Sequence, residues 1–301
     1  MKRILVTGGT TFVSKYTASY FVQKGYEVYV LNRGSKPQVS GVNFLKGDRH
    51  NPIQLPDGMH FDSVIDITAY NGIDVKDLLK SVTSFETYIL LSSSAVYPET
   101  ENQPFSEECE RRENVFWKQY GTDKIDAENT ALKTVPDAYI LRPPYLYGPM
   151  NNVYREAFVF DCAKENRPFY LPRDGEMKLQ FFYVKDLCRI MEKIVEEKPC
   201  EHILNVGNPE SITVKDWVKL CYECAGKKPD FINVREQIEQ RNYFPFYDYE
   251  YALDVSKQKV LLSEVTGLRE GLKECFEWYC KNEGDVKKKP LLQFIDEKFG
   301  E

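Results

Sequence analysis

The chain contains few of the residues that usually form metal centres. Only three of its 301 residues are histidines, His50, His60 and His202, and they lie far apart. The eight cysteines are also scattered, and the Cys-x-x-Cys motif at 221–224 has no second copy. Structural zinc sites normally combine two such pairs. We therefore expect no metal site, and we interpret the cysteines as reduced thiols of a cytoplasmic protein.

Two further absences concern the partners of the chain. Positive charge is not in excess, because the formal net charge is −6. A nucleic-acid partner is therefore not expected, since binding to a phosphate backbone needs a basic surface. No run of about 18 apolar residues occurs, so a membrane span is not expected. The chain enters directly into an apolar strand, so a signal peptide is not expected either.

The first 33 residues are typical of a strand, a glycine turn, a helix and a second strand. A unit of this form directs the free N–H groups of the helix at the turn, which creates a site for a pyrophosphate. The turn runs Thr7-Gly8-Gly9-Thr10-Thr11-Phe12, and Thr11 and Ser14 stand where the usual pattern has glycine. Thr11 either obstructs a phosphate or donates its hydroxyl to one. The turn alone therefore fits both a cofactor site and an ordinary strand-to-helix connection.

Strand and helix patterns continue to alternate, which indicates an α/β fold with a Rossmann-type, doubly wound parallel sheet. We predict a dinucleotide-binding domain at 1–149 plus about 181–208, and a smaller C-terminal α/β substrate domain at about 150–180 plus 209–301. The aromatic segment 243–251 is either a packed loop or the wall of a pocket. The expected strands are 42–45, 63–67, 87–92, 138–142, 181–184 and 203–206, and the expected helices are 74–83, 118–134, 186–197 and 213–225.

Two segments carry residues suited to catalysis. The strand at 87–92 ends in serines 92–94, at the sheet edge where ligands of such folds bind. Tyr120 and Lys124 are four residues apart and share one face of a predicted helix. An ammonium beside a phenol favours the phenolate and lowers the pKa of the tyrosine. Tyr20 and Lys24 have the same spacing but no preceding serine-rich strand end, so we interpret them as structural.

Together these motifs resemble an extended short-chain dehydrogenase/reductase of the NAD-dependent epimerase/dehydratase family. The resemblance covers roughly residues 1–210 and follows the order of motifs in the family. It rests on Thr7-Gly8-Gly9-Thr10, Gly47-Asp48, Ser-Ser-x-x-Val-Tyr97, Tyr120 with Lys124, Arg142 with Tyr147-Gly148-Pro149, Phe182-Tyr-Val184-x-Asp186 and Asn205-Val-Gly207.

The resemblance implies a role for each matching position. Ser93 would hydrogen-bond the substrate oxygen, Tyr120 would be the general acid/base, and Lys124 would lower the pKa of Tyr120 and hold the nicotinamide ribose. The other implied cofactor positions are Gly8, Thr10, Thr11 and Phe12 at the pyrophosphate, Asp48 at the adenine, Thr68 and Ala69 after the fourth strand, and Pro143 and Tyr145 near the nicotinamide.

The second strand ends in Asn32-Arg33, where many NAD-specific relatives carry an acid. Without that carboxylate a 2′-phosphate is not repelled, and Arg33 could pair with it. The expected cofactor is therefore NAD or NADP, with NADP slightly favoured. The alternative reading of Arg33 is a solvated turn residue.

The positions around the catalytic serine bear on the type of reaction. The 4,6-dehydratases of the family carry Asp-Glu where this chain has Ser94-Ala95, so that reaction does not fit. Tyr145 and Gln180 replace residues that hold the nucleotide in many epimerases, and Arg241 and Tyr251 could compensate. Ser94, Tyr145, Gln180, Arg241 and Tyr251 are therefore the candidate substrate-binding residues.

We expect an NAD(P)-dependent epimerase or dehydrogenase that acts on a hydroxyl or carbonyl of a sugar or nucleotide sugar. The resemblance also implies a homodimer formed through the helix that carries Tyr120 and Lys124. The alternative is a non-catalytic dinucleotide-binding regulator, or an RNA-binding member of the family's atypical branch.

Overall fold

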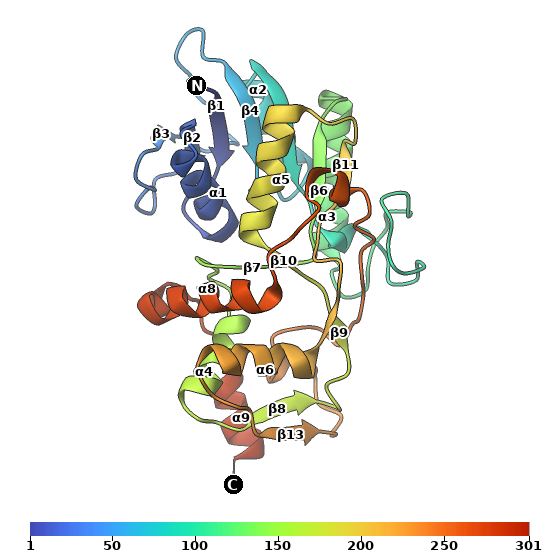
Figure 1. Cartoon of the computed structure of the whole chain (residues 1–301). Helices are drawn as coiled ribbons and strands as arrows, with labels where there is room; N and C mark the ends of the chain where they lie inside the picture. The colour runs from blue at the N-terminus through green and yellow to red at the C-terminus, as the bar shows by residue number, and fades with distance from the viewer. Residues whose placement is uncertain (301) are drawn as a thin grey trace.

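The computed structural model describes residues 1–300, with a seven-stranded parallel sheet at one end of the molecule (Figure 1). The strand order is β11-β6-β5-β4-β1-β2-β3, which confirms the doubly wound α/β class. Since β1 lies between β4 and β2, the order reverses beside β1, and such a switch point is where ligands bind. The strands are β1 (Arg3–Thr7), β2 (Glu27–Asn32), β3 (Asn43–Lys46), β4 (Phe61–Asp66), β5 (Phe85–Leu91), β6 (Tyr139–Arg142) and β11 (Ile203–Asn205).

Helices cover both faces of this sheet. α1 (Phe12–Gln23) and α5 (Val184–Glu197) pack on one face, and α2 (Gly72–Ser81) and α3 (Gln119–Thr134) pack on the other. Successive strand residues alternate between the two cores, as Ile4 and Val6 belong to one and Leu5 to the other. Burial on both faces explains why the strands read as continuous apolar runs in the sequence.

The other end of the molecule consists of short helices and two-stranded sheets (Figure 1). Parallel pairs form between β7 and β10 and between β8 and β13, and β9 pairs antiparallel with β12. The remaining elements are β7 (Tyr145–Tyr147), α4 (Glu156–Lys164), β8 (Phe169–Pro172), β9 (Lys178–Leu179), β10 (Phe181–Tyr183), β12 (Ile212–Thr213), α6 (Val214–Cys224), β13 (Phe231–Val234), α7 (Gln258–Leu261), α8 (Leu268–Lys281) and α9 (Leu291–Phe299), with 3-10 turns η1 (Ser94–Val96), η2 (Gln240–Asn242) and η3 (Glu283–Asp285).

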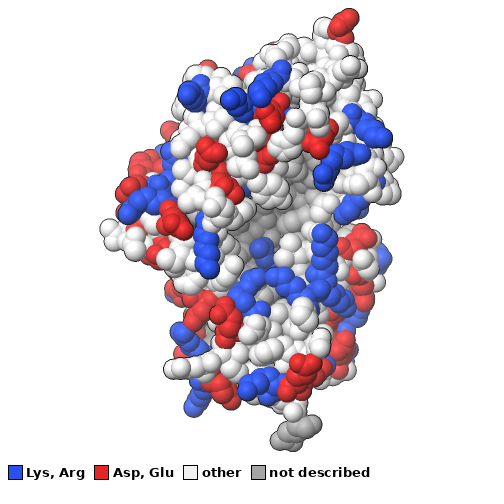
Figure 2. Space-filling view, turned by 180° about the vertical axis from the view of Figure 1, so that it is seen from behind, with Lys and Arg blue, Asp and Glu red and all other residues white. Residues whose placement is uncertain are grey.

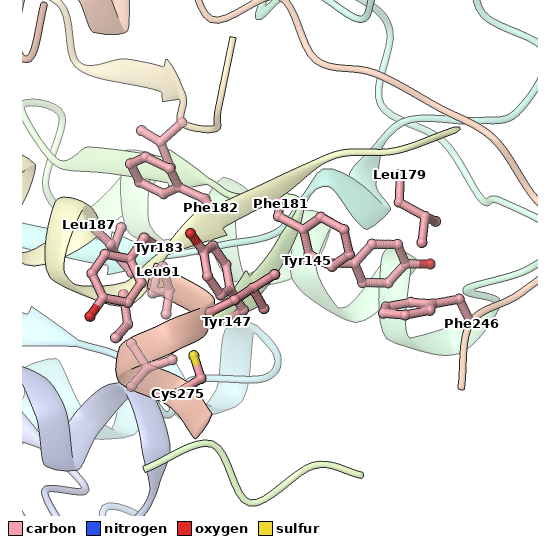
Figure 3. Packing of buried hydrophobic residues seen from close by; sticks show 14 of the residues in the cluster. Leu91, Tyr145, Tyr147, Leu179, Phe181, Phe182, Tyr183, Leu187, Phe246 and Cys275 are labelled. Atoms are coloured by element: carbon pink, nitrogen blue, oxygen red, sulfur yellow. The ribbon is translucent and has the colours of Figure 1, made fainter. Parts of the chain in front are cut away.

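Aromatic side chains join the two ends (Figure 3). Tyr145 and Tyr147 come from β7 and meet Phe181 of β10, and the ring centroids of Tyr145 and Phe246 are 4.7 Å apart. Phe246 belongs to the aromatic segment 243–251, which is a loop packed into the core. Its Tyr251 also borders a cavity, so both readings of the segment apply. The predicted boundaries of the two domains stay predictions.

No helix within residues 1–300 is long and apolar enough to span a membrane. No group of three or more histidine, cysteine, aspartate or glutamate side chains in the same range is arranged to hold a metal ion. The interpretation of Tyr20 and Lys24 as structural agrees with their contacts, because both bind Glu192 of α5.

Candidate active site

A cavity of about 410 Å³ opens at the carboxyl ends of the parallel strands, beside the switch point. It brings together Ser93, which follows β5, with Tyr120 and Lys124 of α3. The serine, tyrosine and lysine identified in the sequence therefore share one pocket. Its other predicted residues are Thr11, Phe12, Thr68, Ser94, Pro143, Tyr145 and Tyr251.

Tyr120 lies in the first turn of α3, close to the segment that contains Ser93. The helix can approach because the next residue is Gly121, where a Cβ would overlap the carbonyl oxygen of Ala95. Tyr120 is 40 % exposed at the cavity, yet burial of its hydroxyl raises its pKa, while a hydrogen bond with Ser93 acts in the opposite direction. The phenol is therefore protonated near neutral pH in this arrangement.

Lys124 is buried one turn further along α3. Its Nζ donates to the carbonyl oxygens of Ala69, at 2.7 Å, and Leu91, at 2.9 Å. Burial lowers the pKa of Lys124 to about 8, although the carboxylates of Asp66 and Glu128 act to raise it. The prediction that the pKa of Tyr120 is lowered is wrong for this state, because burial of the phenol outweighs the hydrogen bond with Ser93 and the charge of Arg155.

A buried carboxylate fixes the same face of α3 against the sheet. Glu128 follows Tyr120 and Lys124 at intervals of four residues, and it is fully buried. Its carboxylate accepts hydrogen bonds from Arg142, at 2.7 and 2.9 Å, and from Ser92. Burial alone would raise the pKa of Glu128, but the charge of Arg142 lowers it overall. This pair could not be predicted from the sequence, because only the fold brings α3 to the end of β6.

The glycine turn has the backbone that a pyrophosphate site needs. Gly8 and Gly9 have φ values of +89° and +84°, and a Cβ on Gly8 would lie 2.8 Å from atoms of Ser14 and Thr68. Thr11 is the N-cap of α1 without a side-chain cap, so the first N–H groups of the helix keep the capacity to bind an anion. The Thr11 hydroxyl accepts a hydrogen bond from Lys36 at 3.2 Å. These features fit a dinucleotide, and Thr10, Thr11 and Phe12 border an adjoining cavity of about 250 Å³.

A third cavity, of about 360 Å³, lies at the ends of β1 and β2 and contains the residues predicted for the adenosine. Asn32 is held in place because its amide donates to the Gly8 carbonyl at 2.6 Å. Arg33 is exposed and Asp48 is half-buried, and both border this cavity. The buried ion pair of Arg49 with Asp66, at 2.8 Å, fixes the loop on which Asp48 lies.

The structure separates the candidate substrate residues into two groups. Ser94 and Tyr251 border the main cavity and their hydroxyls are hydrogen-bonded at 3.0 Å. Gln180 does not border it, because its side chain is buried and bonded to the backbones of Asn208 and Leu253. A substrate contact by Gln180 is therefore a wrong prediction. Arg241 is not part of the cavity lining either and lies over the ring of Tyr247, 4.6 Å from its centroid.

Ala69 also requires a correction. Its side chain does not border any of the three cavities, and its carbonyl oxygen accepts the hydrogen bond from Lys124. Ala69 is therefore a support for Lys124. Its neighbour Thr68 does border both the main cavity and the adenosine cavity.

A glycine turn at the switch point of a doubly wound sheet, with serine, tyrosine and lysine in one pocket, defines a dinucleotide-binding fold of the dehydrogenase/reductase type. Residues 4–207 match the sequence profile of the NAD dependent epimerase/dehydratase family, and the chain belongs to this family.

Relatives of the chain include both nucleotide-sugar enzymes and a stem-loop binding protein. It is 27% identical over 284 residues to the chloroplast stem-loop binding protein of 41 kDa b of Arabidopsis thaliana, with 87% of this chain and 74% of the relative covered. It is 25% identical to a trifunctional UDP-glucose 4,6-dehydratase/UDP-4-keto-6-deoxy-D-glucose 3,5-epimerase/UDP-4-keto-L-rhamnose-reductase of the same plant. That match covers 95% of this chain but only 49% of the relative.

Solved structures share the fold. The protein MoeE5 in complex with UDP-glucose and NAD superposes with a TM-score of 0.73 at 21% identity, covering 93% of this chain and 99% of that one. At this level of identity the likeness establishes the fold and leaves the reaction open.

Proposed function

We propose that the protein is an NAD(P)-dependent oxidoreductase or epimerase that acts on a hydroxyl or carbonyl of a sugar or nucleotide sugar. The observation that carries this proposal is the single cavity shared by Ser93, Tyr120 and Lys124, next to a glycine turn that fits a pyrophosphate. The complex of MoeE5 with UDP-glucose and NAD supports the same classes of ligand.

In this proposal each side chain has one task. The Ser93 hydroxyl donates a hydrogen bond to the substrate oxygen. Tyr120, protonated in this state, donates its proton to the substrate carbonyl as it is reduced, and in the oxidising direction its phenolate takes the proton from the substrate hydroxyl. Lys124 is held by two carbonyl oxygens, so its position is fixed and its remaining N–H can bind the cofactor ribose. When bound at the turn formed by Gly8 and the start of α1, NAD(P) would supply hydride acceptance and return.

The proposal does not include 4,6-dehydration of the family type. The two positions after Ser93 hold Ser94, bonded to Tyr251, and Ala95, which is buried. Neither can act as the acid or base that expels a hydroxyl. A preference for NADP through Arg33, a homodimer and a cytoplasmic location stay predictions.

The match to the chloroplast stem-loop binding protein favours one other candidate, a non-catalytic family member that binds RNA. The net charge of −6 and the intact Ser93, Tyr120 and Lys124 oppose it. The two candidates differ in whether Tyr120 has a chemical task.

The first test is calorimetric titration with NAD⁺ and NADP⁺, followed by nicotinamide absorbance during incubation with sugars and nucleotide sugars. We expect Tyr120→Phe to bind cofactor normally and to lose about 100-fold or more in turnover, because general acid–base catalysis contributes about that much. An Arg33→Ala variant tests the NADP preference. If neither cofactor binds, or if Tyr120→Phe keeps full turnover, the proposal is wrong.

A further inference from the structure

A positive charge without a carboxylate partner within residues 1–300, that of Arg155, borders the active-site cavity. Arg155, the N-cap of α4, lines the cavity together with Ser93 and Tyr120. Its guanidinium carbon lies 4.9 Å from the centroid of the Tyr145 ring and 5.7 Å from that of Phe246. This side chain is thus held over an aromatic surface at the reaction centre.

The charges of two more cations act in the same region. Arg241 is positioned over the ring of Tyr247. Partial burial, and then the charges of Arg241 and Arg155, lower the pKa of Lys289. We call Arg155, Arg241 and Lys289 the cation cluster. Figure 2 shows lysine and arginine side chains gathered along the hollow between the two ends of the molecule.

The charge of the cation cluster is not neutralised by the protein. Several other cations of this half of the chain have carboxylate partners, as Arg167 pairs with Asp296, Arg173 with Asp248 and Lys288 with Asp161. Within residues 1–300 the three members of the cluster form no such pair. Holding like charges together without a counter-ion is unfavourable, so the arrangement is typical of a site for an anion.

An unpartnered hydroxyl points to a ligand at the same place. Tyr145 is only 5 % exposed, borders the cavity, and its hydroxyl has no hydrogen-bond partner within residues 1–300. Burial raises the pKa of Tyr145, and the charges of Arg155 and Arg241 oppose this rise, so the hydroxyl lies near both. Buried hydroxyls without partners are rare in folded proteins, and an oxygen of a ligand would satisfy this one.

We propose that the substrate carries a carboxylate or phosphate on the sugar itself, beside the reacting carbon, and that Arg155 binds this group, with the charges of Arg241 and Lys289 adding to the attraction. The location follows from Arg155, which shares the cavity with Tyr120 and lies near enough for its charge to act on the Tyr120 hydroxyl. A guanidinium can bind two oxygens of either anion at once, and a lysine adds a mobile point charge. The inference rests on the proposed function, because Tyr120 defines the reacting carbon.

The test compares sugars that differ in charge at the sugar. Binding of glucose and glucose 6-phosphate, and of UDP-glucose and UDP-glucuronic acid, is followed by tryptophan fluorescence, since Trp117 packs between Tyr145 and Tyr247. Each titration is made with and without NAD⁺. We expect the charged member of at least one pair to bind roughly tenfold to hundredfold tighter, the range typical of charge-assisted hydrogen bonds.

Arg155→Gln should abolish this difference. The matched control is Arg269→Gln, which removes an exposed arginine of α8 that pairs with Glu223, and it should keep the difference. Lys289→Gln changes an exposed residue and tests the cluster independently if Arg155→Gln is poorly folded.

The outcomes separate this inference from the proposed function. Equal binding within both pairs, or no binding of any of the four sugars, overturns the inference even if NAD⁺ binds. If Arg155→Gln weakens the binding of UDP-glucose and of UDP-glucuronic acid equally, the inference is also overturned, because the cluster would then hold the diphosphate. If NAD⁺ fails to bind, the proposed function falls, and the titrations without NAD⁺ still decide the inference.

Discussion

Replacement of Glu128 by glutamine should strongly destabilise the protein. The side chain of Glu128 is fully buried and that of its partner Arg142 is 1 % exposed, at a separation of 2.7 Å. Removal of one charge leaves the other buried without a counter-ion, which typically costs about 3–5 kcal/mol. We expect about 3 kcal/mol, the lower end of that range, because Arg142 keeps its hydrogen bond to the Tyr97 hydroxyl at 2.8 Å.

Urea unfolding at pH 7, followed by circular dichroism, measures this loss for Glu128→Gln. Glu110→Gln is the matched control, because Glu110 and Arg112 form an exposed pair at 3.1 Å, and exposed pairs contribute about 0–1 kcal/mol. A loss of less than about 1 kcal/mol in the free energy of unfolding of Glu128→Gln would be no larger than the contribution of an exposed pair. In that case the buried ion pair does not hold α3 as we infer.

The pH dependence provides a second check on the same pair. Since the pKa of Glu128 is lower in the folded protein than its ordinary value of 4.5, the stabilisation is fully present above that value. It is lost as the pH falls through the lower pKa of the folded state. The difference in stability between the wild type and Glu128→Gln should therefore shrink in acid, and a constant difference would contradict the assignment.

Two other changes test the cofactor site. Gly8→Ala should weaken NAD⁺ binding, measured by calorimetry, by about tenfold or more, which is about 1.4 kcal/mol. The reason is that the added Cβ would lie 2.8 Å from atoms of Ser14 and Thr68. The control is Gly58→Ala, also at positive φ but with no atom within 4 Å of the added Cβ, and it should bind NAD⁺ normally. The affinity of the free enzyme for the cofactor should fall as the pH rises past about 8, where Lys124 loses its charge. Lys124→Met should remove this pH dependence. If the cofactor affinity of the wild type does not change with pH, the role of the ammonium is refuted.

The doubly wound parallel sheet could be predicted from the sequence because strands buried on both faces are apolar throughout and are separated by helical patterns. α8 was not among the expected helices. Its buried face consists of Gly271, Leu272, Cys275 and Tyr279, with a single aliphatic side chain among them. These residues recur at helical spacing, so this helix could have been predicted and was missed.

The site shows which kinds of inference a sequence supports. The spacing of Tyr120 and Lys124 predicts that they share a cavity, since helix geometry alone sets their relation. The direction of the Tyr120 pKa depends on burial, which spacing does not describe, and there the prediction failed. The prediction of a substrate contact by Gln180 failed for a related reason. A polar residue near a strand end can bind either a ligand or, as here, the backbone.

The two sides of the cavity also differ in how they are built, and this difference bears on specificity. Ser93 and Lys124 are positioned by a sheet edge and a helix, so any chain with this fold can present them to a substrate. Arg155 and Lys289 lie outside regular elements, at the start of α4 and before α9, and aromatic contacts rather than a shared element hold the arginine. The catalytic residues thus lie on regular elements, and the residues that recognise the substrate lie on irregular segments. This division allows the substrate to change during evolution while the catalytic residues stay in place. The charge of the substrate should therefore be read from the cation cluster, and the reaction class from Ser93, Tyr120 and Lys124.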